Sequence, residues 1–174
     1  MPTMDSFLIW WLRSGRYIWS RLRRQLFERR YPATALPAVN SLEEIEACLK
    51  QVTWTMDGPL HLFDCISYPQ TVWAKKKDDC DGFAILAAEL LSSWSPETNP
   101  VLITAIVRPV QSSHTVCAFR YNDSLLYFDN SELRQGNFQG YRDVVAQFTK
   151  GTQGLVCWDV VKPDTLKTLE FHVA

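Results

Sequence analysis

Three residues that could act as a nucleophile, a base and a carboxylate that orients the base occur in order along this 174-residue chain. Cys80 lies between acidic residues at the start of an apolar run, His114 opens a β-branched segment, and Asp129 closes the next one. His114 follows Cys80 by 34 residues, and Asp129 follows His114 by 15. A thiol activated by an oriented imidazole attacks acyl carbons and forms a thioester. The pattern therefore predicts a Cys80–His114–Asp129 triad.

The segment that follows Cys80 predicts a buried helix. Asp78 or Asp79 can cap its start, and Ala, Leu and Ile recur at helical spacing from Cys80 to Trp94. Backbone N–H groups in the first turn lack partners and the helix dipole is positive there, which favours a thiolate. We therefore expect a lowered pKa for Cys80. A cysteine that only packs in the core is the alternative interpretation.

Nearby residues offer the other groups that acyl transfer needs. Asn130 could replace Asp129 as the orienting group, because amides serve this role in other cysteine enzymes. The backbone N–H of Cys80 would stabilise the oxyanion, with a second donor from the preceding loop, where Gln70 and Trp73 are the candidates. Cysteine, histidine and aspartate also bind zinc, but no fourth ligand accompanies these three at a suggestive spacing.

The elements that must position these residues follow from the hydrophobic pattern. Residues 53–77 form an aromatic-rich approach loop with one helical turn near 71–74, and 132–140 is irregular. Helices come first and strands second, which predicts an α+β fold with the cysteine-bearing helix packed on an antiparallel sheet. Besides 80–94, helices are expected at 42–52 and 141–148, and strands at 101–107, 114–121, 125–129, 155–161 and 166–173.

The N-terminal part of the chain predicts a basic amphipathic helix over residues 4–30. Seven arginines stand against two acids in residues 1–31, a net charge of +5, although the whole chain has a net charge of −1. A proline-containing linker at 32–37 separates this extension (1–31) from a domain at 38–174. The helix could pack on the domain or on a second copy, or lie on an anionic membrane surface. Its apolar stripe is Phe7, Trp11, Ile18, Leu22 and Leu26.

Charge and cysteine content restrict the partners and the compartment. The overall charge gives no electrostatic case for nucleic acid. Five cysteines without a CxxC pair indicate reduced thiols in a cytosol-like compartment. No stretch approaches the ~20 apolar residues of a membrane span. We expect a cytoplasmic protein, with peripheral membrane attachment through residues 4–30 as an option.

The combined motifs resemble the papain-like transglutaminase superfamily and, within it, the bacterial transglutaminase-like cysteine proteinases. The resemblance covers about residues 60–135 and includes Pro69, eleven residues before Cys80. It implies a cysteine peptidase or related acyl transferase acting on a protein or peptide. The alternative is a catalytically inactive member that binds a partner or a membrane through the basic helix. The matching strings are Asp79-Cys80-Asp81-Gly82-Phe83-Ala84, His114-Thr115-Val116 and Phe128-Asp129-Asn130.

The resemblance also raises the question of calcium. Relatives of this kind can bind calcium through acids around the cysteine, but Gly82 stands where the family has its second acid. Asp78, Asp79 and Asp81 remain as oxygen ligands. A solvated acidic N-cap is the alternative role for these residues, and the default expectation is that no cofactor is bound.

Overall fold

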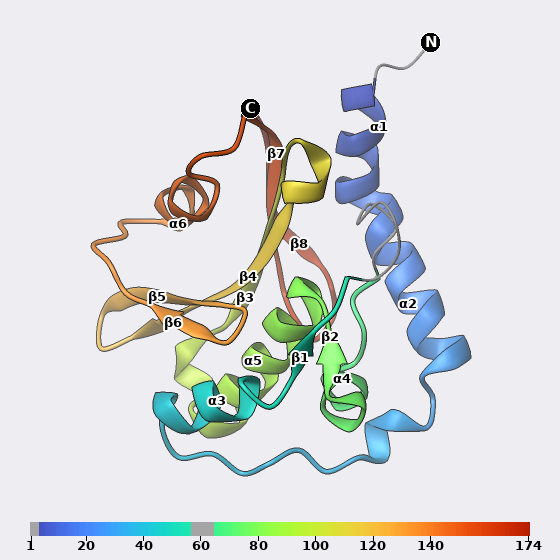
Figure 1. Cartoon of the computed structure of the whole chain (residues 1–174), viewed down its shortest axis with the longest axis vertical. Helices are drawn as coiled ribbons and strands as arrows, with labels where there is room; N and C mark the ends of the chain where they lie inside the picture. The colour runs from blue at the N-terminus through green and yellow to red at the C-terminus, as the bar shows by residue number, and fades with distance from the viewer. Residues whose placement is uncertain (1–3, 57–64) are drawn as a thin grey trace.

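A computed structural model describes residues 4–56 and 65–174 and has an α+β architecture (Figure 1). Residues 57–64 of the expected approach loop lie outside the described residues. The helical elements in chain order are α1 (Met4–Trp10), the π-helical η1 (Trp11–Gly15), α2 (Arg16–Phe27), η2 (Tyr31–Ala33), α3 (Leu42–Leu49), α4 (Pro69–Lys75), α5 (Cys80–Trp94), η3 (Pro96–Thr98), η4 (Val110–Ser112) and α6 (Tyr141–Phe148).

Six strands form an antiparallel sheet in the order β6-β5-β4-β3-β7-β8, and two short strands form a separate parallel pair. The predicted hairpin is confirmed: β4 begins and ends at the expected residues, and β5 ends as expected at Asp129 and begins one residue early, at Ser124. The strands are β1 (Thr53–Trp54), β2 (Lys77–Asp78), β3 (Val101–Arg108), β4 (His114–Tyr121), β5 (Ser124–Asp129), β6 (Glu132–Arg134), β7 (Gly154–Val161) and β8 (Thr168–Val173).

Helices cover both faces of this sheet, and strand alternation decides which residues face which helix. On one face, Leu102 of β3 and Cys117 of β4 pack in a core with α5. This helix is the cysteine-bearing helix that the sequence predicts to pack on the sheet. On the other face, Ile103 and Val116 pack against α6. The predicted fold, a helix that begins at Cys80 and packs on an antiparallel sheet, is therefore confirmed.

The N-terminal helix covers the rest of the face that α5 occupies. Leu8 and Leu12 pack against Ile106 of β3 and against Val156 and Cys157 of β7. On this face, the first residues of β3 pack against α5, and the last residues of β3 pack against the N-terminal helix (Figure 1). The candidate site lies at the junction of these two helices.

Three details of the local predictions were wrong. The expected apolar stripe of the N-terminal helix does not face the domain: Trp11 is buried, but Ile18 and Leu26 are more than half exposed. Instead Arg16 and Arg24 are buried, because partners in the domain bond their guanidinium groups. The segment expected to be irregular contains β6, and the loop before Cys80 contributes β1 and β2. Each of these strands is only two or three residues long, too short to show an alternating pattern.

Candidate thiol site

Cys80 is the first residue of α5, and the acidic turn before it caps the helix as predicted. The side chain of Asp79 accepts a hydrogen bond from the backbone N–H of Asp81, with N and Oδ1 3.0 Å apart. An aspartate in this position satisfies one of the unpaired N–H groups of the first turn. Cys80 itself is buried, with 8% of its surface exposed. The thiol is therefore held at a rigid helix start.

His114 and Asp129 form the contact that the triad prediction requires. His114 begins β4 and Asp129 ends β5, and Nε2 of the imidazole lies 2.8 Å from Oδ1 of the carboxylate. This hydrogen bond, aided by the imidazole's charge, lowers the pKa of Asp129 against the opposing effect of its burial. The ring of Phe148 in α6 meets the imidazole edge to face, with centroids 5.8 Å apart. Since Asp129 engages Nε2, the other ring nitrogen, Nδ1, is the one left for a reacting group.

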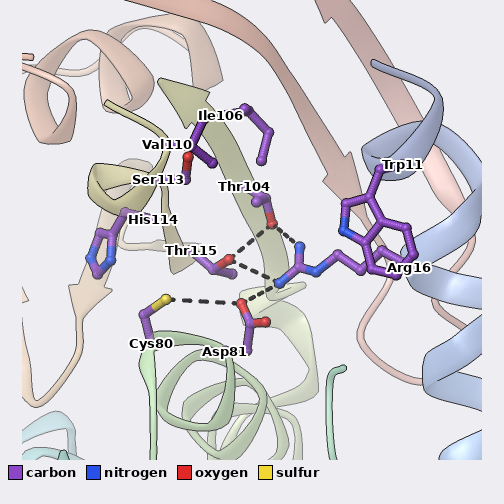
Figure 2. A pocket seen from close by; sticks show the side chains of 10 residues that line it. All are labelled: Trp11, Arg16, Cys80, Asp81, Thr104, Ile106, Val110, Ser113, His114 and Thr115. Carbon is purple, nitrogen blue, oxygen red and sulfur yellow. Dashed lines mark hydrogen bonds and ion pairs between the residues drawn. The ribbon is translucent and has the colours of Figure 1, made fainter. Parts of the chain in front are cut away.

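A small cavity brings Cys80 and His114 together (Figure 2). Its volume is about 30 Å³, enough for roughly two water molecules. The remaining lining residues are Trp11, Arg16, Asp81, Thr104, Ile106, Val110, Ser113 and Thr115. Two of these, Trp11 and Arg16, come from the N-terminal helix, so the extension completes the wall of the site.

Arg16 is the site residue that the sequence did not predict. Its guanidinium is ion-paired with the carboxylate of Asp81 and donates hydrogen bonds to Oγ1 of Thr104 at 2.7 Å and of Thr115 at 3.2 Å (Figure 2). Burial alone would lower its pKa, but the charge of Asp81 reverses the effect and raises the pKa. No local pattern marks Arg16, because its neighbours in sequence include six other arginines and its partners lie far along the chain.

The electrostatic environment of Cys80 differs from the prediction. Burial raises the pKa of the thiol well above its usual value, and the negative charges of Asp81 and Asp79 raise it further. A hydrogen bond from the backbone of Thr115 and the charge of Arg16 lower the pKa of the thiol, but by less than burial and the two carboxylates raise it. The side-chain partner of the thiol is Asp81, with Sγ and Oδ1 4.0 Å apart (Figure 2). The expectation of a lowered pKa was wrong, because desolvation and two adjacent carboxylates outweigh the helix dipole.

The remaining predicted site residues lie outside the cavity. Gln70 and Trp73 are in α4, and neither lines the cavity that Cys80 and His114 share. Their oxyanion role stays a prediction without geometric support. Asn130 follows Asp129 in a left-handed turn with φ of 51°, and it is Asp129 that bonds His114. The predicted orienting group thus has the expected contact, whereas its alternative does not.

The acidic side chains that gather around Cys80 supply fewer oxygen ligands than a calcium ion takes. Calcium takes six to eight oxygen ligands. The potential ligand atoms that gather here belong to Asp79, Cys80 and Asp81, all within 4.8 Å of one another. Asp81 is already ion-paired with Arg16, and Asp79 caps α5. A guanidinium therefore supplies the positive charge that a metal would bring.

The zinc alternative has no geometric support either. Among the described residues, the group of potential metal ligands at this site is the Asp79–Cys80–Asp81 cluster, and it does not include His114 or Asp129. Asp129 is instead hydrogen-bonded to the imidazole of His114. The arrangement matches a base with its orienting carboxylate better than a tetrahedral zinc site.

A second buried polar pair lies beside this cluster. The hydroxyl of Tyr17 donates a hydrogen bond to Asp159 of β7, with Oη and Oδ2 2.6 Å apart. Burial raises the pKa of Asp159 to about 7, although the bond from Tyr17 and the charge of Arg16 oppose this. Two adjacent residues of the N-terminal helix, Arg16 and Tyr17, thus each contact a buried aspartate of the domain.

Comparison with known proteins found similarity to solved structures only. No family model matches the sequence, and no curated protein matches it. The structures include calcium-bound LapG of Legionella pneumophila at 18% identity and a TM-score of 0.47, covering 67% of this chain and 62% of that one. A second structure of LapG has the same identity and TM-score and covers 68% and 64%. EGTA-treated LapG matches at 16% identity and a TM-score of 0.45, covering 68% and 63%.

The chain spans less than two thirds of the length of each of these LapG structures. Similarity at this level does not assign an activity to the chain.

Proposed function

We propose that the chain is a thiol enzyme of the transglutaminase-like cysteine peptidase type, which cleaves or transfers acyl groups of a protein or peptide substrate. The observation that carries the proposal is the 2.8 Å contact between His114 and Asp129 at the edge of the cavity that Cys80 lines. A helix start, a strand start and a strand end supply the three groups. A nucleophile, its base and an orienting carboxylate are the three groups that this chemistry needs.

The proposed reaction has two steps. Sγ of Cys80 attacks the acyl carbon while Nδ1 of His114 takes the thiol proton, and Asp129 stabilises the imidazolium through Nε2. The tetrahedral intermediate collapses to a thioester as the leaving amine takes that proton. Water or a second amine then attacks the thioester, gives its proton to His114, and the thiolate leaves and is reprotonated. The backbone N–H of Cys80 is the proposed oxyanion donor, because it lies at the start of α5.

Arg16 has a positioning role in this proposal. A buried carboxylate next to the nucleophile raises the pKa of the thiol, and the guanidinium of Arg16 offsets part of that effect. It also joins α2 to β3 and β4 through Thr104 and Thr115. We infer that Arg16 holds the first turn of α5 and the start of β4 at a fixed distance, which keeps Cys80 beside His114.

A different observation favours the rival function, a catalytically inactive binding module. The thiol is buried, has a raised pKa and is directed at Asp81 (Figure 2). A cysteine in this state is a poor nucleophile. In this alternative, His114 and Asp129 stabilise the end of the β4–β5 hairpin at which β4 begins and β5 ends, and the N-terminal helix provides the binding surface.

Acylation by p-nitrophenyl acetate separates the two functions without knowledge of the natural substrate. The full chain is incubated with the ester, and acetyl groups are located by peptide mass spectrometry. The enzyme predicts acetylation of Cys80 in the wild type and its loss in His114→Ala. His172→Ala is the matched control, because this exposed imidazole contacts Glu170 and lies outside the cavity. Equal acetylation of Cys80 in the wild type and His114→Ala, or none in either, supports the binding module.

Addition of hydroxylamine then distinguishes transfer from hydrolysis. If the thioester reacts with amines, acetyl hydroxamate accumulates and the release of free acetate falls. If water is the preferred acceptor, hydroxamate forms no faster than in the uncatalysed reaction of a free thioester with hydroxylamine. Asp129→Ala should reduce acetylation less than His114→Ala does, since it removes the orienting group and leaves the base in place.

A further inference from the structure

The side of the N-terminal helix that faces away from the domain is strongly apolar. We call this side the outer face. It belongs to α1 and α2, which run along one edge of the molecule (Figure 1). Each of its large apolar side chains is at least 39% exposed, and Phe27 reaches 76%. These side chains are Met4, Phe7, Trp10, Ile18, Trp19, Leu22, Leu26 and Phe27.

Attachment of the helix to the domain does not account for these residues. The helix is fixed by its opposite side, where Leu8 and Leu12 are fully buried and Ser20 bonds the backbone of Ile66. Eight large apolar side chains are exposed on this one side of the helix, and exposed apolar patches mark contact sites. The outer face is therefore available to a partner while the helix stays packed.

The charges around the outer face are of one sign. The exposed charged residues of the described segment 4–30 are Arg13, Arg21, Arg29 and Arg30. The two acids in this segment are already occupied: Asp5 is ion-paired with Arg108, and buried Glu28 accepts hydrogen bonds from Ser67, Tyr68 and Thr71. A basic rim around tryptophan, phenylalanine and leucine is the composition of helices that lie in the headgroup region of membranes.

We propose that the outer face docks on a lipid bilayer that contains anionic headgroups, with the helix lying in the plane of the membrane. Aromatic and aliphatic side chains enter the boundary between headgroups and acyl chains, and the arginines contact lipid phosphates. A second copy of the chain fits less well. A two-fold dimer through this face would bring the exposed arginines of both copies together, and the two acids of the described segment, Asp5 and Glu28, already have partners of their own.

The test is vesicle flotation of the full chain. Vesicles of phosphatidylcholine with 30% phosphatidylserine are compared with vesicles of phosphatidylcholine alone. The expected result is binding to the anionic vesicles only. The variant Arg13→Gln/Arg29→Gln/Arg30→Gln should weaken the partition coefficient about a hundredfold, since each arginine near the surface contributes about fivefold. The matched control, Lys150→Gln/Lys162→Gln/Lys167→Gln, removes three exposed charges elsewhere and should bind as the wild type does.

A second variant tests the apolar part of the face. Leu22→Glu/Leu26→Glu should abolish flotation, whereas Leu169→Glu, at an exposed leucine of β8, should leave it unchanged. These positions are exposed, so circular dichroism of each variant should match the wild type. Absence of flotation, binding that the Leu22/Leu26 variant retains, or a dimer in light scattering that this variant dissociates would overturn the proposal. The last result would assign the outer face to a second copy.

Discussion

Arg16 of α2 and Asp81 of α5 form a buried ion pair, with 6% and 3% of their side chains exposed. Asp81 is the residue after Cys80, so this pair connects the N-terminal helix directly to the start of the cysteine-bearing helix. The division of the chain into an extension at 1–31 and a domain at 38–174 stays a prediction. In the structure, the extension forms one wall of the thiol cavity.

Loss of Arg16 should strongly destabilise the fold. Arg16→Leu leaves the carboxylate of Asp81 buried without its counter-ion, and breaking a buried pair in this way costs about 3–5 kcal/mol. Urea unfolding measures the loss. Arg13→Leu is the control, because Arg13 is on the same helix but exposed, and it should change the free energy of unfolding by less than about 1 kcal/mol. In Arg16→Leu/Asp81→Asn the loss should be smaller than in Arg16→Leu alone, and an equal or larger loss would contradict the pairing.

Neutralising Asp81 should make Cys80 more reactive. The charge of Asp81 raises the pKa of the thiol, so Asp81→Asn should lower this pKa and increase the rate of iodoacetamide labelling at a fixed pH near 8. Mass spectrometry reports the rate at each cysteine. Cys117 is the internal control, because its pKa is raised by burial alone. An unchanged ratio of Cys80 to Cys117 labelling would mean that Asp81 does not influence the thiol.

Stability should fall as the pH rises from about 4 to 7. Asp159 has a folded-state pKa of about 7, and the unfolded value is about 3.9. The folded chain thus keeps a proton that the unfolded chain releases, and this stabilisation is complete below pH ~4 and lost as the pH passes 7. The loss is up to about 4 kcal/mol. The lowered pKa of Asp129 has the opposite sign, but it acts below pH ~4.

Urea unfolding at several pH values checks this prediction. Asp159→Asn keeps an acceptor for the Tyr17 hydroxyl and cannot ionise, so its stability should be nearly flat between pH 4 and 7. A slope in this variant equal to that of the wild type would assign the pH dependence to another group.

The sequence predicted those parts of the fold that depend on local patterns. The start of α5 was set by an acidic cap before an apolar run, and the β4–β5 hairpin by a polar turn between two β-branched runs. The N-terminal helix was predicted, but not the side that it buries. The hydrophobic spacing predicts that the apolar stripe faces the domain. In the structure much of that stripe is exposed, and Arg16 and Arg24 face the domain because buried groups there accept their hydrogen bonds.

The candidate site could be predicted only in part for the same reason. His114 and Asp129 sit at strand ends of one hairpin, so their contact follows from neighbouring segments. The pKa of Cys80 depends on burial and on charges that meet only in the folded chain. Arg16 lies 65 residues before Asp81 in the sequence, and nothing in either segment indicates the other.

Calcium should have little effect on the chain. Arg16 already neutralises Asp81, and the described residues offer few of the oxygen ligands that calcium needs. The melting temperature in 1 mM calcium chloride should therefore match that in EGTA. A rise of several degrees with calcium would show binding to the folded state, and loss of the rise in Asp79→Asn would place it at this cluster.

The close approach of Gly82 to Asp78 reverses the usual effect of an alanine substitution. In a helix, Gly→Ala normally stabilises by about 0.5–1 kcal/mol. A Cβ at Gly82 would lie 2.2 Å from Cβ and 2.3 Å from Cγ of Asp78. The Asp78 side chain is buried and accepts a hydrogen bond from the backbone of Asp79, so it cannot move freely. Gly82→Ala should therefore destabilise the chain by about 1–3 kcal/mol.

Gly140→Ala is the control, because a Cβ there would meet nothing within 4 Å, and its urea midpoint should stay close to that of the wild type. If Gly82→Ala unfolds at the same or a higher urea concentration than the wild type, Asp78 does not occupy this place and an acid at position 82 could be accommodated.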